Sequence, residues 1–271
     1  MTGCYTKEGL AYWNSESMKL EPQRLVPFKV DITNQEDVDK AVEMVEGFGN
    51  CKDKGIWALI NNAGIKRSFP DEWMSVEDYQ EIFGTNCFGH IRMTHGFRHL
   101  LKKGKGRIIF MNSHVSHTTG PDANPYGCSK AALANYASTI RHELSGAVKV
   151  ITIYPGFHGD RWKDVPEYMT PYENKWAEQP ESKKLDYSKS FFKKRYQFRK
   201  VILLLLHVGN RVEEVSNAVL TAISARFPNT NYWLGFDGNF SLLMSCFPES
   251  TNVFVWKILR YVLFDYLKPI P

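Results

Sequence analysis

The chain has 271 residues, of which 43% are hydrophobic and 23% charged, and its formal net charge is +5. These values are typical of one globular α/β domain spanning 1–271, and they exclude disordered and repeat architectures. The positive charge is modest and much of it lies in one run at 193–200, so composition argues against a nucleic-acid partner.

The five cysteines form no Cys-x-x-Cys pair, which favours reduced thiols and an intracellular, reducing compartment. The first twenty residues lack the apolar core of a signal peptide, and no stretch approaches the ~18 apolar residues of a spanning helix. Segments 191–208 and 240–267 mix basic, aromatic and aliphatic residues. Two interpretations of these segments stay open: peripheral contact with a membrane, such as that of the endoplasmic reticulum, and ordinary core packing.

Short apolar runs followed by turn residues predict buried strands at 25–32 and 56–64. Between them Val38, Ala41 and Val45 recur at helical spacing, which predicts a helix. The alternation continues with helices across 75–102 and 124–145 and with strands at 107–113 and 148–156. It predicts a Rossmann-like, doubly wound parallel sheet.

After the last of these strands the alternation of strands and helices ends. Residues 157–210 are rich in Pro, Trp, Tyr and charges, and they follow the carboxyl end of a strand, where a substrate lid is expected. We therefore interpret 157–210 as a lid insert and 230–271 as an apolar C-terminal extension. Histidine pairs at 95/99 and 114/117 lack a third ligand in pattern, so we expect no metal site.

Tyr126 and Lys130 stand four residues apart in a predicted helix, so their side chains share one face. A lysine ammonium beside a tyrosine favours the phenolate, which makes the tyrosine usable as a general acid or base. The spacing alone is common in exposed helices. Ser113, however, ends the preceding strand, and the turn NNAG at 61–64 ends the strand before it, both at the sheet edge where such folds place ligands.

Together these motifs resemble the short-chain dehydrogenase/reductase family from about residue 25 onward. The resemblance implies a catalytic set in which Tyr126 transfers the proton, Ser113 orients the substrate oxygen, Lys130 lowers the tyrosine pKa and Asn86 supports a proton relay. It implies NAD as cofactor, with NADP as the alternative. The implied cofactor-binding residues are Asp31, Asn61, Ala63, Gly64, Tyr126, Lys130, Pro155 and Gly156.

Within the family, segments such as VDIT, GRIIFMNS and the tail ending in LKPIP are similar to the retinol and hydroxysteroid dehydrogenase branch. That branch implies a hydrophobic alcohol as substrate, and aromatic residues in 157–200 suit an apolar pocket. A small hydroxy acid, used by a related member, stays open.

The sequence departs from the family pattern at one feature, the glycine-rich turn. In the family this turn follows the first strand and binds the pyrophosphate of the cofactor. We find no such turn, and we interpret residues 4–9 as the end of the family's second strand and the start of a helix, so the first strand is expected to be missing. Two hypotheses follow: a fragment or alternative product of a complete dehydrogenase, or a non-catalytic interaction protein. A homodimer through the helices at 75–102 and 124–145 is a further expectation.

Overall fold

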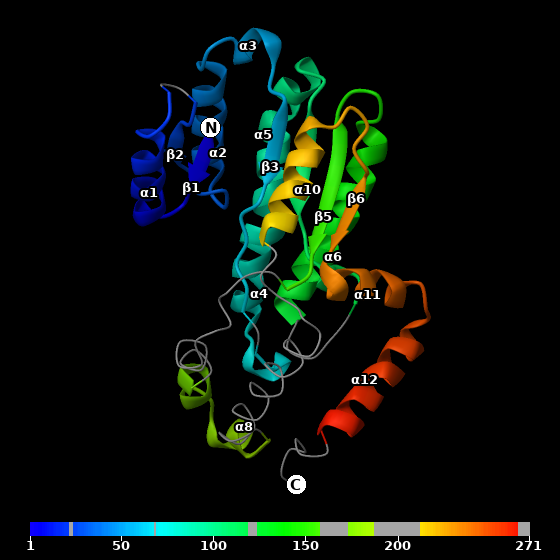
Figure 1. Cartoon of the computed structure of the whole chain (residues 1–271). Coiled ribbons are helices and arrows are strands. Elements are labelled where there is room, and N and C mark those ends of the chain that lie inside the picture. The colour runs from blue at the N-terminus through cyan, green and yellow to red at the C-terminus, as the bar shows by residue number, and fades with distance from the viewer. Residues whose placement is uncertain (22–23, 68, 119–123, 158–172, 187–211, 265–271) are drawn as a thin grey trace.

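The computed structural model describes residues 1–21, 24–67, 69–118, 124–157, 173–186 and 212–264. Parallel strands carry helices on both sides, and a long C-terminal helix extends away from them (Figure 1). Within these ranges no helix is both long and apolar enough to cross a bilayer.

The larger sheet has four parallel strands: β3 (Ala58–Asn61), β4 (Arg107–Met111), β5 (Lys149–Pro155) and β6 (Asn231–Leu234), in that order. This confirms the predicted Rossmann-like parallel sheet, although each strand is shorter than its apolar run. The sequence pattern missed β6, so the expected C-terminal extension from residue 230 begins inside the sheet.

A separate sheet joins β1 (Thr2–Cys4) to β2 (Pro27–Lys29), also in parallel. β1 lies between β2 and β3 in Figure 1, yet no hydrogen-bonded ladder joins β1 to β3. In the described part of the chain, β1 and β3 therefore each keep one edge without a strand partner. As expected, residues 4–9 run from the end of β1 into the helix that begins at Lys7.

The helices follow their sequence signals closely. Asn34 caps one of them by accepting from the amides of Glu36 and Asp37, and Ser75 forms a capping box with Asp78. The described helices are α1 (Lys7–Ser17), α2 (Gln35–Glu46), α3 (Cys51–Lys54), α4 (Val76–Phe83), α5 (His90–Lys103), α6 (Asn124–Glu143), α8 (Glu181–Asp186), α10 (Val212–Ser224), α11 (Gly235–Ser245) and α12 (Glu249–Phe264).

Side chains alternate across the sheet and create two cores. Along β4, Ile108 and Phe110 belong to the cluster formed with α2, α5 and α6, whereas Ile109 and Met111 belong to the cluster formed with α10. All but Met111 are fully buried. Because both faces of β4 are covered, the strand reads as a continuous apolar run rather than an alternating one.

The expected lid insert lies mostly outside the described residues. Residues 173–186 are described and include α8. They contact the rest of the chain through Lys175, whose Nζ lies 3.5 Å from Oδ2 of Asp78 at the start of α4. A lid function for 157–210 stays a prediction.

Candidate active site

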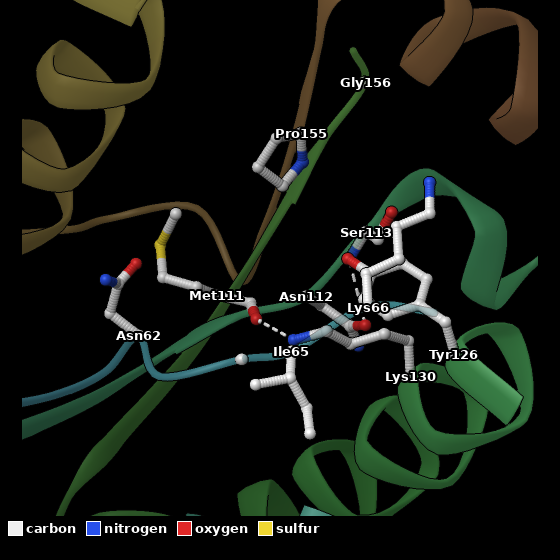
Figure 2. Close-up of a pocket in the computed structure, with 11 residues that line it drawn as sticks. Asn62, Ile65, Lys66, Met111, Asn112, Ser113, Tyr126, Lys130, Pro155 and Gly156 are labelled. Carbon is white, nitrogen blue, oxygen red and sulfur yellow. Dashed lines mark hydrogen bonds between the residues drawn. The ribbon is translucent and has the colours of Figure 1, made fainter. Parts of the chain in front are cut away.

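A cavity of about 270 Å³ opens at the carboxyl ends of β3, β4 and β5. Its volume is close to the lower end of the range for small-molecule sites, roughly 300–1,000 Å³. Figure 2 shows Pro155 and Gly156 on one side and Ser113, Tyr126 and Lys130 on the other. The lining residues are Asn62, Gly64, Ile65, Lys66, Met111, Asn112, Ser113, Tyr126, Lys130, Pro155 and Gly156.

Tyr126 lies in the first turn of α6 and shares a hydrogen bond with Ser113, which follows β4 by two residues. Burial raises the pKa of the Tyr126 phenol, and the hydrogen bond with Ser113 opposes that rise without cancelling it. The sequence predicted that Lys130 lowers the pKa of Tyr126. In the protein alone the pKa of Tyr126 is raised, because desolvation has the larger effect. At neutral pH the phenol is protonated.

Lys130 is 3% exposed, and its Nζ donates to the carbonyl of Met111 at 2.8 Å (Figure 2). The same Nζ lies 5.9 Å from the centroid of the Tyr126 ring. Burial lowers the pKa of Lys130 to about 8. The Lys130 ammonium therefore lies close to the tyrosine, and it gains or loses its proton near physiological pH.

Asn86 is fully buried, and its side chain ties three segments together. Oδ1 accepts from the Ile65 amide at 2.8 Å, and Nδ2 donates to the Ile65 carbonyl at 2.9 Å and to Ser129 Oγ at 3.1 Å. Asn86 lies in a π-helical turn, Gly84–Gly89, that interrupts the helix expected across 75–102. Such turns break the regular hydrogen-bond ladder and are frequent at functional sites.

The cavity includes only some of the expected cofactor residues. Gly64, Pro155 and Gly156 line it, whereas the Asn61 side chain is buried against Thr94, with Nδ2 donating at 3.2 Å. Ala63 does not line it either; its carbonyl lies 2.8 Å from Nε2 of His90.

Asp31 belongs to the other sheet region, just after β2. Its Oδ1 accepts from the amide and the hydroxyl of Thr33 at 2.8 and 2.7 Å. Asp31 does not line the cavity, so a role for it in cofactor binding stays a proposal.

Five lining residues were missed by sequence reasoning: Asn62, Ile65, Lys66, Met111 and Asn112. Each is a near neighbour of a residue that was selected. Because the carboxyl ends of parallel strands meet at one edge, the residues that follow NNAG and flank Ser113 were the available signal.

An aspartate from the C-terminal region fixes the far wall of the cavity. Asp237, in the first turn of α11, accepts from the Phe157 amide through Oδ2 at 2.7 Å. Its Oδ1 is buried, has no hydrogen-bond partner among the described residues, and lies 1.8 Å from where a Cβ on Gly156 would stand. Only glycine fits at 156 with Asp237 in this position.

His90 contacts the backbone of the NNAG turn. It is completely buried; Nε2 contacts the Ala63 carbonyl, and Nδ1 is buried with no hydrogen-bond partner in the described part of the chain. Burial first, and then the charge of Lys130, lower the pKa of His90 to about 3.

This pKa predicts an acid-sensitive fold. Because the folded pKa lies below the ordinary 6.5, the unfolded chain binds more protons below pH 6.5, and stability falls as pH drops toward 3. Between pH 7 and 4.5 we expect His90 alone to cost about 2 to 3 kcal/mol. Urea unfolding of wild type and His90→Gln over this range measures the difference; parallel pH curves for the two proteins would contradict it.

Among the described residues, no group of three His, Cys, Asp or Glu side chains could hold a metal ion. The arrangement is instead a serine, a tyrosine and a lysine beside bare glycine backbone, at the carboxyl edge of a doubly wound parallel sheet. It defines the class of α/β oxidoreductases in which side chains move a proton at the strand ends.

Comparison with known proteins leads to the same class of oxidoreductases. The family profile described as short chain dehydrogenase matches residues 4–161. The rat mitochondrial D-beta-hydroxybutyrate dehydrogenase is 31% identical over 233 residues, covering 85% of this chain and 67% of the relative. The bovine 17-beta-hydroxysteroid dehydrogenase type 6 is 28% identical over 254 residues, covering 92% and 77%.

A solved short chain dehydrogenase from Burkholderia cenocepacia, in complex with NADP, superposes with a TM-score of 0.63 at 23% identity, covering 97% of this chain and 84% of that one. At this identity the superposition shows the fold alone. The chain belongs to the short-chain dehydrogenase family. The family assignment confirms the resemblance and the oxidoreductase class, acting on CH–OH groups, that it implied.

Proposed function

We propose that the chain interconverts a hydrophobic alcohol and its ketone or aldehyde, of the steroid or retinoid type, by hydride transfer with NAD(P). The observation that carries the proposal is the grouping of Ser113, Tyr126 and Lys130 around one cavity. The hydroxysteroid dehydrogenase among the relatives supports the substrate type. So do Ile65 and Met111, which give the cavity an apolar part.

Each side chain has a distinct role in this proposal. Tyr126 donates its proton to the substrate oxygen during reduction and takes it back during oxidation. Ser113, already hydrogen-bonded to the phenol, orients that oxygen. Lys130 holds a positive charge beside the phenol and stabilises the phenolate once the proton has left. Because the pKa of Tyr126 is raised rather than lowered, the phenol carries its proton at neutral pH and can donate it during reduction.

The cavity fits the nicotinamide end of the cofactor. Gly64 presents bare backbone there: a Cβ at this position would lie 3.4 Å from Asn86 Oδ1 and 3.7 Å from Lys130 Nζ. Gly64, Lys130, Pro155 and Gly156 would hold this end, and the cofactor when bound supplies or accepts the hydride. NAD is proposed over NADP, with Asp31, Asn61 and Ala63 as outer contributors.

Location and assembly are part of the same proposal. Exposed apolar side chains on α11, on α12 and in the turn between them support peripheral contact with a membrane such as the endoplasmic reticulum's; they are Phe236, Phe240, Leu243, Phe247 and Phe254. The free cysteines support a reducing, intracellular compartment. A homodimer would form through α4, α5 and α6.

The test is a titration of the purified chain with NADH and NADPH, followed by tryptophan fluorescence, and then an alcohol oxidation assay with a panel of steroids, retinol and simple secondary alcohols. Saturable micromolar binding together with cofactor-dependent turnover is the expected result. A folded chain that binds neither cofactor would overturn the proposal and favour the non-catalytic interaction protein, which the division of the strands into two sheets also supports.

A further inference from the structure

A row of three buried polar side chains runs from the π-helical turn into α5. Asn86, His90 and Thr94 stand four residues apart, and each is 0% exposed. Side chains at this spacing lie on the same face of a helix. Because polar groups shut off from water need partners inside the protein, the partners of this row identify the segment that the helix holds.

The row meets every second residue of the chain at the end of β3. The pairs are Thr94 with Asn61 at 3.2 Å, His90 with Ala63 at 2.8 Å, and Asn86 with Ile65 at 2.8 and 2.9 Å. Four residues of α-helix rise about 6 Å, and two residues of extended chain rise about 6.6 Å. Because these rises are nearly equal, the helix holds the segment 61–65 at three evenly spaced points.

His90 makes the middle contact. A carbonyl oxygen only accepts hydrogen bonds, so Nε2 carries the ring proton and donates it to the Ala63 carbonyl. The ring also stacks on Phe110 of β4, with the centroids 6.3 Å apart. Its other nitrogen, Nδ1, is buried without a hydrogen-bond partner among the described residues. An unpaired buried acceptor opposes folding, so the stability of the fold alone does not account for a histidine here.

The contact with Ala63 acts on the cofactor side of the cavity. Gly64 follows directly and lines the cavity, as do Asn62 and Ile65 on either side of this pair (Figure 2). Gly64 has no side chain of its own to pack, so the contacts of its neighbours decide where its backbone lies. The hydrogen bond from His90 is the one that holds the residue just before it.

We propose that His90 is a positioning residue for the cofactor: by holding the Ala63 carbonyl it fixes the Gly64 backbone, against which the nicotinamide end of NAD(P) binds. This inference rests on the proposed function, to which it adds a residue outside the cavity. Loss of the contact should weaken cofactor binding and leave the chemical step unchanged, because Tyr126 and Ser113 are held by α6 and by the end of β4.

The experiment titrates NADH into wild type, His90→Leu, His90→Gln and His90→Asn, each shown to be folded by circular dichroism. In His90→Leu the dissociation constant for NADH should rise about fivefold to tenfold, the equivalent of one lost hydrogen bond. The amide nitrogen of Gln lies about as far from Cβ as histidine Nε2, whereas that of Asn lies about one bond closer. His90→Gln should therefore stay within about twofold of wild type, and His90→Asn should resemble His90→Leu.

Two further readouts separate positioning from a general loss of stability. At saturating NADH, kcat should stay within about twofold of wild type in all three variants. Hydrogen exchange of the Ile65 amide, which donates to Asn86, should be at least about fivefold faster in His90→Leu without cofactor. Val148→Ala is the matched control: Val148 is 5% exposed and lies just before the amino end of β5, so its truncation should lower stability and leave the NADH dissociation constant unchanged.

The proposal is overturned by an unchanged NADH dissociation constant in His90→Leu, by an equal loss of affinity in Val148→Ala, or by a loss confined to kcat. If His90→Leu does not fold, the comparison of His90→Gln with His90→Asn decides, and equal affinities in these two overturn it. A wild-type chain that binds no NADH overturns the proposed function and this inference together, whereas binding that none of the His90 variants changes overturns this inference alone.

Discussion

Replacing Tyr126 by Phe should lower turnover of any alcohol accepted by the chain by about 1,000-fold, within the range of 10² to 10⁴ for loss of a general acid–base group. The phenol is the group in the cavity that shares a hydrogen bond with Ser113 and lies beside the Lys130 ammonium. Phe keeps the ring and its packing. The measurement is steady-state kcat in both directions, together with the dissociation constant for NADH.

The NADH dissociation constant should stay within about threefold of wild type, since a lost proton-transfer group affects the chemical step rather than ground-state binding. Tyr12→Phe is the matched control, because Tyr12 is 58% exposed on α1 and removal of its hydroxyl should change neither quantity. Turnover retained in Tyr126→Phe would show that another group moves the proton.

Replacing Gly156 by Ala should destabilise the fold by about 1 to 3 kcal/mol, the usual cost of forcing an extra methyl into a packed site. The new Cβ would lie 1.8 Å from Oδ1 and 2.4 Å from Cγ of Asp237. A movement of Asp237 away from the new methyl would disturb the hydrogen bond that Oδ2 accepts from the Phe157 amide. The cofactor side of the cavity would move with it, so NADH affinity should also fall. Urea unfolding and NADH titration measure the two effects.

The cause can be isolated by a double-mutant cycle with Asp237→Gly. In that background the obstructing carboxylate is gone, so the further cost of Gly156→Ala should drop to a few tenths of a kcal/mol. Gly84→Ala is the control glycine, because a Cβ there meets no heavy atom within 4 Å. Equal costs of Gly156→Ala in both backgrounds would show that the clash with Asp237 is not what makes glycine necessary.

The sequence alone predicted most of the sheet because β4 and β5 are buried on both faces and read as unbroken apolar runs. It missed β6, Asn231–Leu234, because a strand of four residues of which only Leu234 is buried is too short to show a strand pattern in the sequence. It also missed the π-helical turn at Gly84–Gly89, because an apolar helical pattern indicates a helix but not the hydrogen-bond spacing of each turn within it.

At the site, local motifs selected Ser113, Tyr126 and Lys130, and the structure brings these three residues together around one cavity. The inference that the pKa of Tyr126 is lowered was wrong. Sequence spacing indicates which charges are near a group, but it does not show how deeply that group is buried. Asp237 was out of reach for a related reason. Its contact with Phe157 joins residues 80 positions apart, and no local pattern encodes it.

The two short strands with open edges have a consequence for handling the protein. The edges of Thr2–Cys4 and Ala58–Asn61 offer unpaired backbone amides and carbonyls within the described part of the chain, and Ile60 beside them is 41% exposed. Such an edge is a template on which any extended polypeptide can add a strand, including another molecule of the same sequence. We therefore expect preparations of this chain to self-associate as the protein concentration rises.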